Sequence, residues 1–179
     1  MKNTALLVID VQNALMEDNP YNGKLLISNI KKLIQMAENH NMNVIYVRHD
    51  GGKNSVLEKD SLGWQIYNEI SPGENAVIFD KSFNSAFKET GLHEHLKSLD
   101  IKRLILTGMQ TEYCIDATCK SAYDLNYEII IPKQSTTTYD NDLISAKTLT
   151  TFFEDQIWQG RFASVIAVDS YSLEKKLLG

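Results

Sequence analysis

The stretch Arg103–Cys119, RLILTGMQTEYCIDATC, joins an apolar run, a polar turn and the start of a helical pattern. Cys114 follows the turn at the start of the helix that we expect over Tyr113–Leu125. At such a position, free backbone N–H groups and the helix dipole favour thiolate, the nucleophilic form of cysteine. The same N–H groups can hold an oxyanion. The stretch predicts a strand–turn–helix unit that presents a nucleophile.

The two cysteines also allow a simpler interpretation, because free cysteines often serve as small buried hydrophobes. We assign Cys119, inside the expected helix, to the core, and we keep that alternative open for Cys114. Five residues apart on one helix, their Cα atoms would lie about 8.7 Å apart. A disulfide allows less than about 7 Å. We therefore expect two free thiols, as in a reducing cytosol.

Short apolar runs alternate with longer helical patterns along the chain. Runs such as ALLVI and VIYV are continuous, which is typical of strands buried on both faces. The alternation predicts a single α/β domain over residues 1–179, a three-layer α/β/α fold with a six-stranded, mostly parallel sheet. The expected strands are Ala5–Asp10, Asn43–His49, Ala76–Lys81, Arg103–Thr107, Glu128–Pro132 and Ser164–Asp169. The expected helices are Leu25–Asn39, Trp64–Ile70, Leu92–Leu99, Tyr113–Leu125 and Asp142–Phe153.

Composition excludes several classes of partner. The formal net charge is −5, without the basic patch that nucleic-acid binding requires. No apolar stretch approaches the ~18 residues of a membrane span. The apolar run Ala5–Ile9 is too short for a signal peptide. We expect a cytoplasmic protein with a small-molecule substrate, no nucleic acid and no membrane.

Polar residues at the strand ends are the candidates for chemistry, because ligands of such sheets bind beyond the carboxyl ends of the strands. A nucleophile at Cys114 needs a base. Asp10 could accept the thiol proton, and Lys81 could hold acid and thiolate together by charge. Each alone is ordinarily a solvated strand-end charge. His49, the only histidine at a strand end, is either functional or packed against a loop.

Three segments, in order, resemble the isochorismatase-like cysteine hydrolases, a superfamily that includes nicotinamidases and N-carbamoylsarcosine amidohydrolase. LLVIDVQNAL carries Asp10, VIFDKSFNSAF carries Lys81, and the segment that begins LILTGMQTEYC carries Cys114. The resemblance covers nearly the whole chain. It implies an Asp10–Lys81–Cys114 triad that hydrolyses a C–N bond of an amide, ureido group or lactam through a thioester-type intermediate.

The resemblance also implies a cis peptide bond at Met109–Gln110. It places the backbone N–H groups of Gln110 and Cys114 in an oxyanion hole. Side chains near these segments are candidates for substrate binding, although aromatic residues at such positions are as often part of the core. The candidates are Gln12, Trp64, Tyr67, Phe83 and Tyr113.

Departures from the family limit the metal prediction. Nicotinamidases bind a metal through one Asp and two His near the second strand. The corresponding VRHDGGKNS offers His49 and Asp50 but no second histidine. We therefore expect no metal and no cofactor. The resemblance and the aromatic-rich segment Phe152–Phe162 also predict a homo-oligomer.

Other functions are kept as alternatives. Some isochorismatases lack the cysteine and cleave a vinyl ether, and a silent family member would act as a binding module. Asp80, Thr107 and Lys133 resemble the layout of a phospho-receiver domain. A dinucleotide-binding domain is excluded, because DVQNALMEDN after the first strand contains no glycine.

Overall fold

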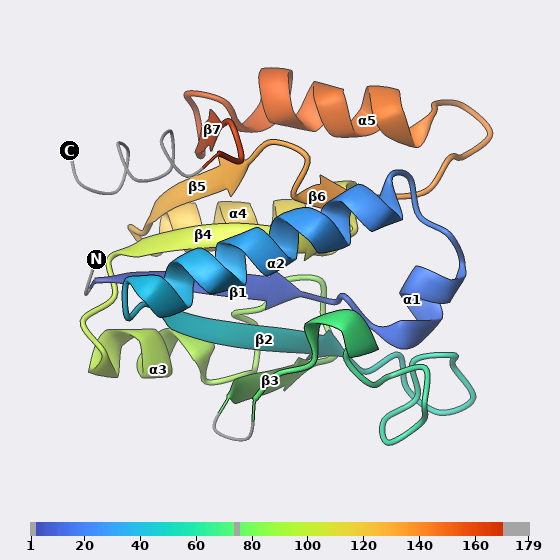
Figure 1. The fold of residues 1–179 in the computed structure, drawn as a ribbon, viewed down its shortest axis with the longest axis horizontal. Helices are drawn as coiled ribbons and strands as arrows, with labels where there is room; N and C mark the ends of the chain where they lie inside the picture. The colour runs from blue at the N-terminus through green and yellow to red at the C-terminus, as the bar shows by residue number, and fades with distance from the viewer. Residues whose placement is uncertain (1–2, 74–75, 170–179) are drawn as a thin grey trace.

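The computed structural model describes residues 3–73 and 76–169, and these residues form a sheet covered by helices on both faces (Figure 1). The strand order is β3-β2-β1-β4-β5-β7, with the short β6 beside β4. All these pairings are parallel. The strands are β1 Thr4–Ile9, β2 Asn43–His49, β3 Val77–Lys81, β4 Arg103–Met109, β5 Glu128–Pro132, β6 Thr136–Thr137 and β7 Ser164–Ile166. The predicted three-layer parallel fold is confirmed.

The sheet differs from the prediction in two details. The described residues contribute seven strands, because the two-residue β6 pairs with Gly108 and Met109 of β4. So short a strand leaves no apolar run in the sequence. The last strand ends at Ile166, before the predicted Asp169. The ends of the predicted domain, residues 1–2 and 170–179, lie outside the described residues.

The helices follow most of the predicted ranges. They are α1 Asn13–Glu17, α2 Gly23–Asn39, α3 Leu92–Ser98, α4 Asp116–Asp124 and α5 Ala146–Phe152, with a 3₁₀ turn η1 Asn68–Ile70 and π-helical turns η2 Thr111–Ile115 and η3 Phe153–Trp158. The predicted helix Trp64–Ile70 is wrong, since only η1 forms there. The helix predicted from Asp142 begins at Ala146, because the Asn141 side chain accepts two backbone hydrogen bonds in a turn and Ser145 caps the helix.

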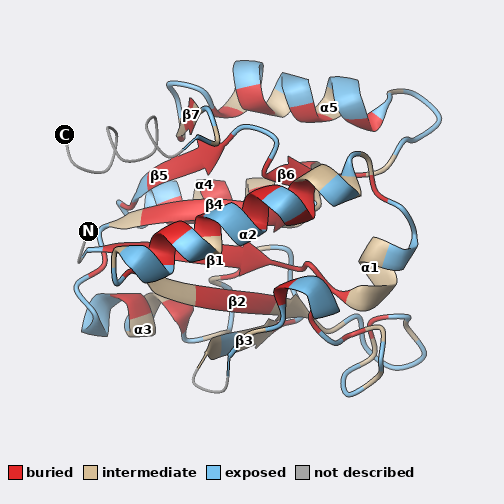
Figure 2. Cartoon of the chain, in the orientation of Figure 1, coloured by how far each residue is buried: buried red, intermediate tan, exposed pale blue. Residues whose placement is uncertain are grey.

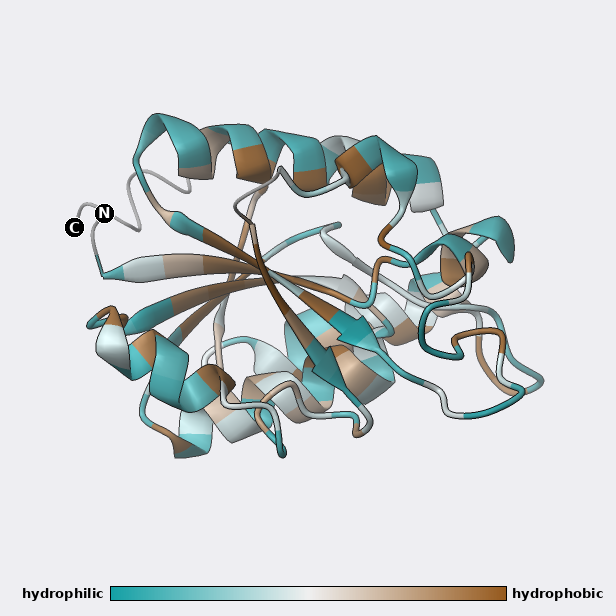
Figure 3. Cartoon of the chain, turned by 90° about the horizontal axis from the view of Figure 1, so that it is seen from below, coloured by the Kyte–Doolittle hydropathy of each residue, from teal (hydrophilic) through white to brown (hydrophobic). Residues whose placement is uncertain are grey.

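The core consists of two apolar layers, one on each face of the sheet. Along β1, Leu7 and Ile9 belong to one layer, and Leu6 and Val8 belong to the other. This alternation is the period of two that a strand imposes on its side chains. The central strands are therefore mostly buried, and the helices turn their apolar sides toward the sheet (Figures 2 and 3).

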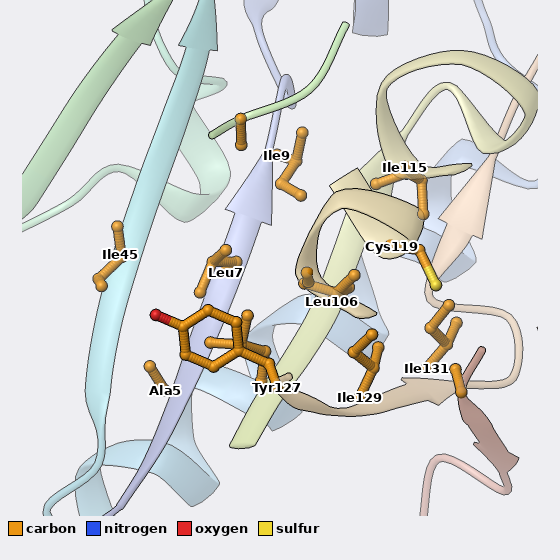
Figure 4. Packing of buried hydrophobic residues seen from close by; sticks show 14 of the residues in the cluster. Ala5, Leu7, Ile9, Ile45, Leu106, Ile115, Cys119, Tyr127, Ile129 and Ile131 are labelled. Carbon is orange, nitrogen blue, oxygen red and sulfur yellow. The ribbon is translucent and has the colours of Figure 1, made fainter. Parts of the chain in front are cut away.

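Different helices cover the two layers. On one face, α2 supplies Leu26, Ile30 and Leu33. On the other, α3, α4 and η3 pack against β1, β4 and β5. Figure 4 shows this second layer, where Cys119 lies among the aliphatic side chains near Ile131. The prediction that Cys119 is a core residue is confirmed.

The aromatic-rich segment Phe152–Phe162 is partly internal. Trp158 is fully buried, and its indole Nε1 donates to Asp116 at 3.0 Å. Phe152 is 46% exposed. Much of this aromatic surface thus packs within one chain, which removes part of the reason to expect an oligomer. A homo-oligomer stays a prediction from the resemblance, and light scattering that gives a 20.3 kDa particle would contradict it.

Candidate active site

Four polar residues meet where neighbouring strands end. Asp10 follows β1, His49 ends β2, Lys81 ends β3, and Cys114 lies in η2 after β4. These four strands are adjacent in the order β3-β2-β1-β4. The chain order reverses between β1 and β4, which is the switch point where parallel sheets bind ligands. The fold therefore brings together the residues predicted from the strand ends.

Asp10 reaches the site through a local turn of the backbone. Ile9 points into the apolar layer under α4, so an extended Asp10 would point to the opposite face. Asp10 instead has φ of 54°. This left-handed conformation is uncommon outside glycine, but aspartate tolerates it. The turn places the carboxylate on the same face as Lys81, where the two form an ion pair.

Gly108 allows β4 to approach the end of β1. Its φ is 125°, and a Cβ at this position would lie 2.0 Å from the carbonyl oxygen of Ile9. Any side chain would therefore separate the two strands at the step before Asp10 and the η2 turn. Gly108 is required for the close approach that brings Asp10 and Cys114 together.

Lys81 is the centre of the cluster. Its Nζ lies 2.6 Å from Oδ2 of Asp10, and both side chains are almost completely buried. The same Nζ donates to Sγ of Cys114 at 3.2 Å and contacts Nδ1 of His49 at 3.2 Å. The buried Asp10 carboxylate also accepts a side-chain hydrogen bond from the Cys114 thiol. The ammonium thus holds the acid beside the thiol, and the carboxylate is in direct hydrogen-bond reach of the thiol proton.

Burial controls the charges of the site. It raises the pKa of Asp10, against the opposing effect of Lys81. Burial, followed by the negative charge of Asp10, raises the pKa of Cys114 to about 12. The thiol is therefore protonated at neutral pH. The expectation that the helix start favours thiolate is wrong for this state of the protein, because desolvation and Asp10 outweigh Lys81.

Backbone N–H groups of the turn around Cys114 are the candidates for an oxyanion hole, because the first N–H groups of a helix have no carbonyl partner within it. Cys114 is the fourth residue of η2, and the N–H groups on either side of it, those of Tyr113 and Ile115, donate to Gln110 O at 3.2 and 3.1 Å. The Met109–Gln110 peptide bond is cis, as predicted. Residues of the run Thr136–Thr138 support this turn from the side. Thr111 Oγ1 bonds Thr136 Oγ1 at 3.2 Å, and Thr138 Oγ1 donates to Glu112 at 2.8 Å.

Gln12 fixes the position of His49. The amide oxygen of Gln12 accepts from His49 N at 2.9 Å, and its Nε2 donates to His49 O at 3.0 Å. Nε2 also donates to Trp64 O at 2.8 Å. Gln12 is fully buried. The Gln12 amide was predicted to bind substrate. It instead forms its hydrogen bonds with the backbone of His49 and of Trp64.

The aromatic candidates lie in different surroundings. Trp64 is buried, its Nε1 has no partner among the described residues, and Arg48 lies 3.5 Å above its ring. Phe83 is at the surface beneath the Lys88 ammonium, and Tyr113 is exposed. Sequence reasoning missed Asn84, whose Oδ1 lies 3.9 Å from Cys114 Sγ. The sequence signal that could have identified Asn84 is its position three residues after Lys81.

Asp10, His49 and Cys114 are also a possible set of metal ligands. One ligand atom from each lies within 4.8 Å of the others. Carboxylate, imidazole and thiolate suit Zn²⁺. However, the Lys81 ammonium already contacts all three side chains at 2.6–3.2 Å. The three residues therefore fit a metal ion only if Lys81 moves away.

Two further observations concern the rest of the chain. A cavity of about 850 Å³ between α2 and α5 includes Leu33, Glu154 and Val168 in its lining. None of the residues predicted for the hydrolase site lines it. Within residues 3–73 and 76–169, every helix is too short or too polar to cross a membrane.

Comparison with known proteins defines the class. A streptothricin hydrolase of Streptomyces noursei is 28% identical over 76% of this chain, which spans only 50% of that protein. Nicotinamidase 3 of Arabidopsis thaliana is 25% identical, with 99% and 90% of the two chains covered. The uncharacterised isochorismatase family protein YrdC of Bacillus subtilis is 27% identical over 92% of both. The protein is a hydrolase with a parallel α/β fold.

The family follows from the sequence match and the fold. The isochorismatase domain matches residues 4–170. A crystal structure of an isochorismatase family protein superposes with a TM-score of 0.87 at 28% identity, covering 93% of this chain and 99% of that one. The chain belongs to the isochorismatase family. The phospho-receiver alternative is therefore wrong, and Asp80, its supposed acceptor, pairs with Arg48 at 2.8 Å.

Proposed function

We propose that the protein hydrolyses a C–N bond of a small molecule with Asp10, Lys81 and Cys114 as its catalytic triad. The substrate class is an amide, a ureido compound or a lactam. One observation carries the proposal: a single buried ammonium contacts both the Asp10 carboxylate and the Cys114 sulfur. A nucleophile beside a base that is itself held in place is the arrangement that covalent catalysis needs.

The first half of the reaction forms an acyl-enzyme. Sγ of Cys114 bonds to the carbonyl carbon while the thiol proton passes to Asp10. The carbonyl electron pair moves to oxygen, and the backbone N–H groups of Gln110 and Cys114 hold the resulting oxyanion. As the C–N bond breaks, Asp10 gives the proton to the leaving nitrogen. Because the thiol is protonated at rest, proton transfer and attack belong to one step.

The second half releases the product. Water attacks the thioester carbon and gives a proton to Asp10. The C–S bond then breaks, and the sulfur regains its proton from Asp10. Lys81 keeps its position throughout and balances whichever of the two residues carries negative charge. All atoms of this cycle come from the chain, the substrate and water.

Substrate recognition belongs to the rim of the site. Phe83 and Tyr113 are at the surface close in sequence to Lys81 and Cys114, and the buried indole N–H of Trp64 has no partner among residues 3–73 and 76–169. We assign these three side chains to substrate contact. Gln12 acts through the backbone of His49, because the atoms of its amide are already bonded.

A screen for ammonia or amine release tests the function. Small primary amides, ureido acids and lactams are incubated with the wild-type protein and with Cys114→Ala in parallel. We expect release from at least one class with the wild type alone, with a thioester adduct on Cys114 visible by mass spectrometry. A vinyl-ether substrate cleaved equally by both proteins would replace this proposal.

A further inference from the structure

His49 is held in a fixed position beside Lys81, although the proposed triad gives it no role. Its Nδ1 lies 3.2 Å from Lys81 Nζ. In parallel register, His49 of β2 stands opposite Lys81 of β3. Both backbone groups of His49 are held by the fully buried Gln12 amide. A buried amide thus fixes the backbone of His49 through two hydrogen bonds, in addition to its bond to Trp64 O.

The contact determines the state of the imidazole. An ammonium has N–H donors and no acceptor, so the facing ring nitrogen must offer its lone pair. A hydrogen bond from Lys81 Nζ to Nδ1 thus requires the neutral tautomer of His49 that carries its proton on Nε2. Burial lowers the pKa of His49, and the charge of Lys81 lowers it further, against Asp10 and Asp50. These effects agree with the geometry.

We propose that His49 is a positioning residue, whose unprotonated Nδ1 holds the Lys81 ammonium between Asp10 and Cys114. Three acceptors, namely the Asp10 carboxylate, the Cys114 sulfur and the His49 nitrogen, surround the three N–H donors of the ammonium. Without His49, the opposite charge of Asp10 would draw the ammonium away from the sulfur. The inference rests on the proposed triad, but its test does not need a substrate.

Three substitutions separate the acceptor from the shape of the side chain. In His49→Asn, the amide oxygen occupies the place of Nδ1, one bond from Cγ. In His49→Gln the amide lies one bond too far out, and His49→Leu has no acceptor. The readout is the rate at which iodoacetamide alkylates Cys114, with the fully buried Cys119 as internal reference.

We expect His49→Leu and His49→Gln to slow alkylation of Cys114 about tenfold, because a buried hydrogen bond to a charged group is worth roughly that factor. His49→Asn should react about fivefold or more faster than either. With an active substrate, the same order should appear in kcat, and KM should stay constant. Equal rates in Asn and Gln variants would overturn the proposal. If His49→Leu does not fold, the Asn–Gln pair still decides.

Nitrogen NMR of the ring gives a second, independent readout. The chain has four histidines, and the spectrum of His49→Asn assigns the missing signal. We expect His49 in the Nε2–H form, with an Nδ1 resonance that shifts in Lys81→Ala. A protonated Nδ1 would overturn the proposal. If this tautomer is found while no amide is hydrolysed, the proposed function fails and the role of His49 stands.

Discussion

Cys114 and Cys119 lie five residues apart in one helical segment, and the pKa of each thiol is raised to about 12. Burial is the main cause at both. Their neighbours differ. Cys114 contacts Lys81 and is hydrogen-bonded to the Asp10 carboxylate, whereas Cys119 packs among aliphatic side chains. The comparison teaches that the resting pKa does not distinguish the proposed nucleophile from a core cysteine. A proton acceptor within reach does.

Replacing each cysteine should give the largest difference. Cys114→Ala is expected to lose at least ~10⁴-fold in kcat, as removal of a nucleophile does. Cys119→Ala should keep kcat within about twofold and lose about 1–2 kcal/mol of unfolding free energy through a small cavity. Steady-state kinetics and urea unfolding measure the two effects. Turnover that survives in Cys114→Ala would remove the basis of the comparison.

Removing the side chains that contact Cys114 should leave its thiol as unreactive as that of Cys119. Asp10→Asn and Lys81→Ala are each expected to lower kcat at least ~10²-fold, the usual contribution of a general base. Lys81→Ala also leaves the Asp10 carboxylate buried without a partner, at a cost of about 3–5 kcal/mol. Protonation of Asp10 relieves this cost, so the deficit should shrink as the pH falls. Circular dichroism melts at several pH values check this.

The pH dependence of kcat/KM is a smaller effect. Asp10 must be ionised to accept the thiol proton, and burial raises its pKa above the ordinary 3.8. The rate should therefore fall with falling pH at values above those of an ordinary aspartate. A profile from pH 4 to 9 measures this, provided that the protein stays folded. An acid limb centred at or below 3.8 would show that Lys81 outweighs burial.

Metal removal should have no effect at all. The Lys81 ammonium occupies the space between Asp10, His49 and Cys114, so a metal ion would have to displace it. Prolonged treatment with a strong chelator is expected to leave kcat unchanged. Loss of activity that zinc, manganese or iron restores would show that Cys114 differs from Cys119 through a metal rather than through Lys81.

Much of this site was predictable from the sequence, for reasons that differ between residues. The apolar runs predict the strands, and the strand ends then place Asp10 and Lys81 at one edge of the sheet. The role of Cys114 required the resemblance. The sequence does not show that Asp10 turns to the other face or that β4 touches β1 at Gly108. Both features depend on the distance between neighbouring strands in the folded sheet, which the sequence of a single strand does not show.

Other features could not be predicted because the segments that form them are too short to show a periodic pattern, or because they depend on the pairing of two strands. The π-helical turn Thr111–Ile115 has no periodic pattern of its own, and β6 is two residues long. The contact between His49 and Lys81 depends on the register of β2 against β3. A one-residue slip of that register would turn His49 to the opposite face.

The four strand ends that form the site have a consequence for folding. Asp10, His49, Lys81 and Cys114 come from four separate strands, and no two of them are neighbours in the sequence. The cluster exists only when β3, β2, β1 and β4 are all in register. Activity is therefore a direct measure of the intact sheet, and denaturant should abolish turnover and sheet structure at the same midpoint. On the proposed mechanism, a partly assembled chain would contain every residue of the candidate site and catalyse nothing.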